Sequence, residues 1–135
     1  MDWLASGGPG EGRETRRPRA GDVARADVPT CGIDARRADV AARVRAAGWS
    51  QCVVVDADGV VLGMLDGEAL EGDAATAADA MREAPSTIRP HLTLEETVKS
   101  LVARRREQVL VTTSDGRLVG LLRRADAERR LSAAA

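Results

Sequence analysis

Apolar residues along the chain form short unbroken runs, and each kind of run occurs twice. The runs 52–55 (CVVV) and 109–111 (VLV) contain no polar position, which predicts buried strands covered on both faces. An Asp-Gly pair follows each run, at 58–59 and at 115–116, and this pair favours the positive-φ turn of a β-hairpin. The returning strands are therefore expected at residues 60–65 and 117–122.

A helix is predicted before each buried strand. In the second half of the chain, an apolar stripe at the spacing i, i+4, i+7 and i+8 consists of Leu94, Val98, Leu101 and Val102. Thr93 stands at the N-cap of this helix, and Glu95 and Glu96 in the first turn complement the helix dipole. The first half has a weaker stripe made of Val40, Ala41 and Val44.

The two halves of the chain are copies of each other, because a shift of 57 positions superposes them without a gap. The matching pairs include Asp22/Asp79, Arg25/Arg82, Thr30/Thr87, Gln51/Gln108, Val54/Val111, Gly63/Gly120, Leu65/Leu122 and Glu71/Glu128. Such a register predicts a tandem repeat, with repeat 1 at residues 20–76 and repeat 2 at 77–133. Each repeat opens with a lead segment, residues 22–26 or 79–83, and a short extended piece at Thr30 or at Thr87 and Ile88. The order β-α-β-β-α is therefore expected twice.

A single repeat of this size has too little core to bury both faces of its sheet alone. We therefore predict an α/β (α+β) module whose two repeats pack sheet to sheet, with pseudo-two-fold symmetry and a cleft between them. Residues 1–19, rich in Gly, Pro and charge, are predicted to be a disordered N-terminal arm.

Composition narrows the possible functions. Twenty Lys and Arg residues against 21 Asp and Glu leave a net charge of −1, which argues against a strongly basic nucleic-acid binder. A single histidine, His91, excludes a multi-His metal site, and no Gly-rich phosphate loop or nucleophile–base pair points to an enzyme. Because no apolar stretch approaches the ~20 residues of a membrane span, we expect a soluble cytoplasmic protein without membrane contact. Cys31 and Cys52 are interpreted as small buried residues with reduced thiols, and a disulfide between neighbouring strands is the alternative.

Three stretches together resemble a known family, the paired cystathionine-beta-synthase (CBS) domains of a Bateman module. They are TAADAMREAPSTIRP at 76–90, the helix TLEETVKSLVARR at 93–105, and QVLVTTSDGRLVGLLRRAD at 108–126. The last is similar to the family's strand, Asp-Gly turn, strand and closing motif, Gly-hydrophobic-hydrophobic-Thr/Ser-x-x-Asp. The resemblance implies a regulatory module that binds AMP, ADP, ATP or S-adenosylmethionine between its repeats and commonly dimerises. It also implies that the motif's Asp holds the ribose, its Thr or Ser helps to hold phosphate, and the first strand contacts the base.

In repeat 2 the resemblance places Asp126 at the ribose position, although Asp126 could equally be a helix N-terminal residue that the dipole stabilises. Arg123 replaces the Thr or Ser, and it either pairs with a phosphate or fills the pocket and blocks it. The expected nucleotide-binding residues are Thr87, Ile88, Arg89, Pro90, Arg123, Arg124 and Asp126. The run 104–106 (RRR) is interpreted as a solvated helix C-terminus.

Repeat 1 is predicted to have no working nucleotide site. Ala69 stands at the ribose position without a side-chain acceptor, and Asp66 at the phosphate position would cap the closing helix but repel a phosphate. The charges agree, because five Arg and ten acidic residues give repeat 1 a net charge of −5, whereas eleven basic and eight acidic residues give repeat 2 a net charge of +3.

The leading hypothesis is a stand-alone, non-catalytic CBS-pair protein, a homodimer, that senses an adenine nucleotide and acts on a protein partner in trans. No cofactor and no metal are expected. The alternative is a structural or oligomerisation module whose ligand sites have decayed, favoured by the departures at Asp66, Ala69 and Arg123.

Overall fold

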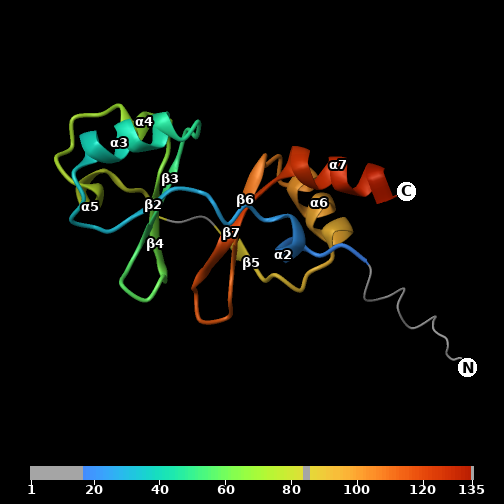
Figure 1. The fold of residues 1–135 in the computed structure, drawn as a ribbon. Helices are drawn as coiled ribbons and strands as arrows, with labels where there is room; N and C mark the ends of the chain where they lie inside the picture. The colour runs from blue at the N-terminus through green and yellow to red at the C-terminus, as the bar shows by residue number, and fades with distance from the viewer. Residues whose placement is uncertain (1–16, 84–85, 135) are drawn as a thin grey trace, which may run out of the picture.

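The computed structural model describes residues 17–83 and 86–134 and contains two similar halves (Figure 1). The elements of the first half are α2 (Ala20–Val23), β2 (Thr30–Cys31), α3 (Arg37–Ala46), β3 (Cys52–Val55), β4 (Val61–Leu65) and α4 (Gly67–Leu70). Those of the second half are α5 (Ala77–Ala80), β5 (Thr87–Ile88), α6 (Leu94–Ala103), β6 (Gln108–Thr112), β7 (Leu118–Arg123) and α7 (Arg124–Ala134). The predicted β-α-β-β-α order is confirmed, and a one-turn helix that the sequence analysis did not predict precedes it in each repeat.

Each repeat has one three-stranded sheet, ordered β2-β3-β4 in the first and β5-β6-β7 in the second. The short first strand runs parallel to the central strand, and the third strand returns antiparallel to it. The predicted hairpin turns are present, because Gly59 and Gly116 have φ angles of 87° and 90°. At these angles glycine avoids the Cβ clash of other residues.

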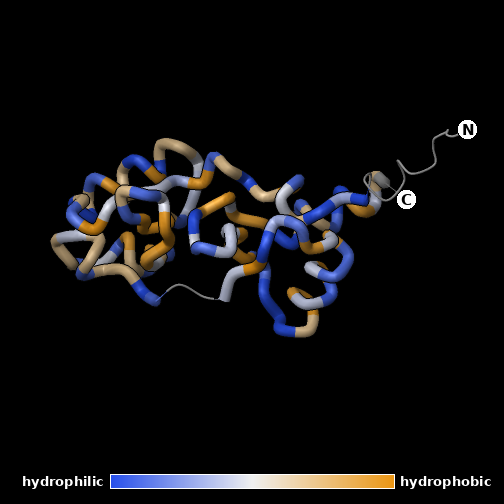
Figure 2. Tube along the Cα trace, turned by 90° about the horizontal axis from the view of Figure 1, so that it is seen from below, coloured by the Kyte–Doolittle hydropathy of each residue, from blue (hydrophilic) through white to orange (hydrophobic). Residues whose placement is uncertain are grey.

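The central strands are covered on both faces, as their unbroken apolar runs predict. Side chains alternate along a strand, so Cys52 and Val54 of β3 join the core beneath α3, while Val53 faces the other repeat. In β6, Leu110 faces the other repeat in the same way. The core between the repeats consists of Val28, Val53, Leu110 and Leu121. Hydrophobic segments accordingly lie inside each half and along the strands between them (Figure 2).

Residues 57 positions apart meet at the pseudo-two-fold axis. The side chains of Gln51 and Gln108 donate to each other over 3.1 and 3.2 Å. Val60 and Arg117, also 57 positions apart, form an antiparallel bridge that joins the two hairpin turns. The repeat detected in the sequence is therefore the symmetry of the fold.

The lead segments are exchanged between the repeats. Helix α2 lies against repeat 2, where the N–H of Ala20 donates to the carbonyl of Leu92 over 2.8 Å (Figure 1). After α2, Arg25 forms a bridge with Leu121 of β7, and its counterpart Arg82 forms a bridge with Met64 of β4. Arg25 of repeat 1 thus extends the sheet of repeat 2, and Arg82 of repeat 2 extends the sheet of repeat 1.

Most of the predicted N-terminal arm, residues 1–16, lies outside the described residues. The last residues of the arm contact repeat 2, because the carbonyl of Pro18 accepts from the N–H of Leu94 over 3.0 Å and Arg19 forms a bridge with Thr93.

Helix α6 begins as predicted, and Leu94, Val98 and Leu101 of the predicted stripe pack in the core of repeat 2. The Thr93 side chain caps it by accepting from the Glu96 N–H over 3.3 Å. The expectation that Val102 belongs to the buried stripe is wrong, because Val102 is 51% exposed and Thr97 is buried in the helix interface. The Thr97 hydroxyl donates to the carbonyl of Thr93 over 2.8 Å, and this bond offsets the cost of burying a polar group.

Arg105 follows α6 with a φ of 55°, at the position where repeat 1 has Gly48 with a φ of 79°. A side chain in this left-handed region is strained, whereas glycine is not. We therefore expect Arg105→Gly to raise the free energy of unfolding by about 0.5–1 kcal/mol, measured by urea denaturation. Arg104→Gly is the matched control, because Arg104 has a φ of −94° and gains nothing from glycine. A destabilising Arg105→Gly would contradict the expectation.

Cys31 and Cys52 are both buried free thiols, as the favoured interpretation predicts. They lie on the neighbouring strands β2 and β3. Cys31 is paired in register with Val54, so the two cysteines are offset by two positions along the strands and do not lie directly opposite each other. A hydrogen bond between the thiols lowers the pKa of Cys31 and raises that of Cys52. The Cys52 thiol also donates to the carbonyl of Val53 over 3.8 Å.

Candidate functional site

A cavity of about 480 Å³ lies between the exchanged lead segment of repeat 1 and the closing helix of repeat 2. Its lining residues are Asp22, Val23 and Arg25 on one side and Asp126, Arg129, Arg130 and Ala133 of α7 on the other. The exchange of lead segments creates this arrangement, because α2 packs on both β7 and α7. The volume falls within the range of small-molecule sites.

Asp126 lies in the first turn of α7 with its side chain 18% exposed. One carboxylate oxygen, Oδ1, accepts from Arg129, whose side chain is 73% exposed. The other, Oδ2, is buried and has no hydrogen-bond partner among the described residues. A buried carboxylate oxygen without a donor is costly, and a hydroxyl group of a ligand would satisfy it.

Two arginines from different repeats share one aromatic ring beside this cavity. The guanidinium carbon of Arg123 lies 4.4 Å from the ring centre of Trp49, and that of Arg25 lies 5.3 Å from it. Arg25 also pairs with Asp27 over 2.9 and 3.0 Å, and this hydrogen bonding lowers the pKa of the Asp27 carboxyl. The contact between Arg123 and the Trp49 ring is a cation–π interaction, and it holds the Arg123 guanidinium in place.

The CBS domain family model matches residues 20–69 and 77–133. The chain belongs to the CBS-domain family. A search of curated proteins finds no match.

Solved CBS-pair structures have the same fold at low sequence identity. CBSX2 in complex with AMP is 17% identical with a TM-score of 0.76, over 87% of this chain and 98% of that one. CBSX2 from Arabidopsis thaliana has also been solved as a CBS-pair protein, with a TM-score of 0.73 at 17% identity over 87% and 96% of the two chains. The CBS domain pair of MJ0100, in complex with 5-methylthioadenosine and S-adenosyl-L-methionine, is 14% identical with a TM-score of 0.71. The match covers 87% of this chain and 98% of that one.

The seven residues expected to bind a nucleotide all lie in CBS repeat 2, and only Asp126 of them lines the cavity. Thr87 and Ile88 line a different cavity, against α6. Arg89 is held by repeat 2 itself, because its guanidinium donates to the Thr112 hydroxyl over 2.6 Å and to the Thr87 hydroxyl over 2.7 Å. None of these three residues lines the cavity at Asp126.

Pro90 and Arg124 also lie outside the lining of that cavity. The carbonyl of Pro90 accepts from the N–H of Gly21 over 3.0 Å and so supports α2. Arg124 lies 3.7 Å from Glu107 and 3.8 Å from Glu128, which engage its guanidinium.

The sequence motifs do not predict Asp22 and Arg25, which line the cavity, or Trp49 beside it. Trp49 breaks the internal repeat, since Arg106 occupies the equivalent position in repeat 2. This departure from the repeat is the sequence signal that points to Trp49. The exchange of lead segments cannot be read from the sequence, because it depends on tertiary packing.

The equivalent place in CBS repeat 1 contains exposed ion pairs. Arg82, the counterpart of Arg25, lies 3.3 Å from Asp66 and also pairs with Glu68. Asp66 caps α4 as predicted, with Oδ1 accepting from the Ala69 N–H over 2.8 Å. A second ligand here would have to displace Arg82 and approach two carboxylates.

Within residues 17–83 and 86–134, no helix has the length and apolar character needed to cross a membrane. The same residues contain no group of three or more His, Cys, Asp or Glu side chains placed to hold a metal ion.

Proposed function

We propose that this CBS pair is a non-catalytic regulatory module that binds one adenosine-containing ligand, such as AMP, ADP, ATP or S-adenosylmethionine, in the cavity at Asp126. The observation that carries the proposal is Asp126, which lines the cavity of about 480 Å³ and whose buried Oδ2 lacks a partner among the described residues. A ribose carries two neighbouring hydroxyls, and a carboxylate accepts both. The adenosine ligands of CBSX2 and of the MJ0100 pair support this ligand class.

The cations around the cavity favour a ligand with negative charge. Arg25, Arg129 and Arg130 line the cavity, and Arg123 lies beside it on Trp49. Guanidinium groups pair with phosphate oxygens through two parallel hydrogen bonds. We infer that Arg123 contributes positive potential near the phosphate, while Asp126 holds the sugar.

A ligand in this cavity contacts both repeats at once, because Asp22 and Arg25 come from repeat 1 and Asp126 from repeat 2. Binding would therefore stabilise the docked position of the lead segment on α7. If a partner binds the docked and the undocked lead segment with different affinities, ligand binding changes the affinity for that partner by thermodynamic linkage. We propose that the output is a change in association, with a second copy of this chain or with another protein in trans.

A thermal-shift screen tests the proposal, with AMP, ADP, ATP and S-adenosylmethionine at low millimolar concentration and inorganic phosphate as a charge control. A ligand at 100 times its Kd adds about 2.7 kcal/mol, which raises the Tm of a domain of this size by roughly 10 °C. We expect such a shift from at least one adenosine ligand, and its loss in Asp126→Ala.

Asp115→Asn is the matched control, because it removes one acidic charge from the exposed β6–β7 turn and leaves the cavity intact. If none of the adenosine ligands shifts the Tm, the ligand proposal fails and the module is better described as a structural scaffold. Equal shifts in wild type and Asp126→Ala would place the ligand elsewhere.

A further inference from the structure

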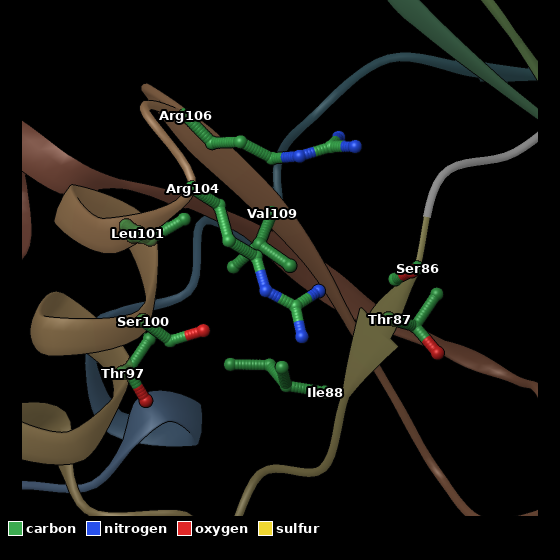
Figure 3. A pocket seen from close by; sticks show the side chains of 9 residues that line it. All are labelled: Ser86, Thr87, Ile88, Thr97, Ser100, Leu101, Arg104, Arg106 and Val109. Carbon is green, nitrogen blue, oxygen red and sulfur yellow. The ribbon is translucent and has the colours of Figure 1, made fainter.

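A second cavity, of about 250 Å³, lies inside repeat 2 between β5 and α6 (Figure 3). Its apolar floor consists of Ile88, Leu101 and Val109. The cavity shares no lining residue with the cavity at Asp126. Any ligand here would therefore be separate from the proposed adenosine ligand.

Two arginines bring positive charge to this cavity. Arg104 and Arg106 follow α6 and line the cavity; the guanidinium of Arg104 lies between Val109 and Ile88, whereas the Arg106 side chain extends above it (Figure 3). None of the nine lining residues is acidic. The interpretation of the 104–106 run as a merely solvated helix end is therefore incomplete.

Hydroxyl groups line the same cavity. The Ser100 side chain points from α6 toward the Arg104 guanidinium (Figure 3), and Ser86 lies at the start of β5. Among the described residues, neither serine side chain forms a hydrogen bond, while Thr97 already donates to a backbone carbonyl. The combination of guanidinium and hydroxyl donors around an apolar floor suits an anion that carries a small apolar group.

In repeat 1 an arginine side chain crosses the equivalent place. Arg43 stands where repeat 2 has Ser100, and its guanidinium donates to the carbonyl of Thr30 on β2 over 2.9 Å. Trp49 stands in place of Arg106, and Ala47 in place of Arg104. The cavity in repeat 2 thus results from particular substitutions between two copies of one unit.

We propose that this cavity binds a small phosphomonoester. Its phosphate is held between the guanidinium groups of Arg104 and Arg106 and accepts from the Ser100 hydroxyl, and its organic part rests on the apolar floor. Two guanidinium groups match the charge of a phosphate dianion, which favours phosphate over a carboxylate. The small volume limits the organic part to about one ring.

The test uses phenyl phosphate as the probe, titrated into the full-length protein and followed by amide NMR. We expect saturable shifts at residues 86–88 and 97–106, and about tenfold weaker binding in Arg104→Ala, because a charge-assisted hydrogen bond contributes on the order of a factor of ten. Phenol and inorganic phosphate are expected to bind more weakly than phenyl phosphate, because phenol lacks the phosphate group and inorganic phosphate lacks the apolar ring.

Two variants distinguish a built site from general attraction to a basic surface. Ser100→Arg copies Arg43 of repeat 1, so it fills the cavity while adding positive charge, and we expect it to abolish binding. Arg105→Gly removes the neighbouring charge, which does not line the cavity, and we expect binding to be unchanged. Tighter binding in Ser100→Arg, or equal loss in Arg104→Ala and Arg105→Gly, would overturn the proposal. So would the absence of saturable shifts in the wild-type protein.

Discussion

Replacing Leu110 with alanine is expected to lower the free energy of unfolding by about 2–5 kcal/mol. Leu110 is fully buried at the centre of the core between the repeats, with Val28, Val53 and Leu121 around it. Truncation removes apolar contacts and leaves a cavity that the two sheets cannot close by a local movement. Because small domains have a total stability of about 5–15 kcal/mol, this loss is a large fraction of the total.

Urea denaturation with an unchanged m-value measures this effect. Val102→Ala is the control, because it also shortens an apolar side chain but at a position 51% exposed. The control is expected to change stability by less than about 0.5 kcal/mol. A loss below about 1 kcal/mol in Leu110→Ala would show that the repeats do not depend on their shared core.

Replacing Gly120 with alanine is expected to destabilise the module by about 1–3 kcal/mol and to weaken binding of an adenosine ligand. A Cβ at Gly120 would lie 2.8 Å from the carbonyl oxygen of Arg25, which is backbone and cannot move aside alone. The adjacent Leu121 exchanges two hydrogen bonds with Arg25, of 2.8 and 3.1 Å. The added methyl group therefore pushes the lead segment of repeat 1 away from β7 and opens the cavity at Asp126.

Gly32→Ala is the matched control, since a Cβ at Gly32 meets no atom within 4 Å. It is expected to leave stability unchanged or to raise it slightly, because alanine reduces the freedom of the unfolded chain. Equal free energies of unfolding for Gly120→Ala and Gly32→Ala would contradict the close approach of the lead segment to β7.

Internal duplication makes the fold predictable from the sequence. The shift of 57 positions identifies pairs such as Gln51 and Gln108, which meet across the axis in the structure. The apolar runs at β3 and β6 predict strands buried on two faces, and both faces are indeed covered. These features depend on local patterns, which a sequence displays directly.

The composition of the cavity at Asp126 depends on tertiary contacts, which local patterns do not encode. The sequence motifs group Asp126 with the first strand of its own repeat, but the lead segment of the other repeat lies beside it in the structure. Only the packing of α2 on α7 brings Asp22 and Arg25 to Asp126. Burial on α6 was misjudged at Val102 and Thr97 for a related reason, since a satisfied threonine hydroxyl fits a core position as well as an apolar side chain does.

The central claim is that one adenosine-ligand site is assembled from both repeats, and amide NMR tests it most directly. AMP, ADP, ATP and S-adenosylmethionine are each titrated into the isotope-labelled protein. The account predicts that at least one of them shifts residues 22–27 together with 123–130, while the equivalent residues at the ion pairs of Arg82, 79–83 and 66–73, stay unshifted. Shifts at residues 79–83 and 66–73 instead, or no shifts at residues 22–27 and 123–130 with any of the four ligands, would contradict it.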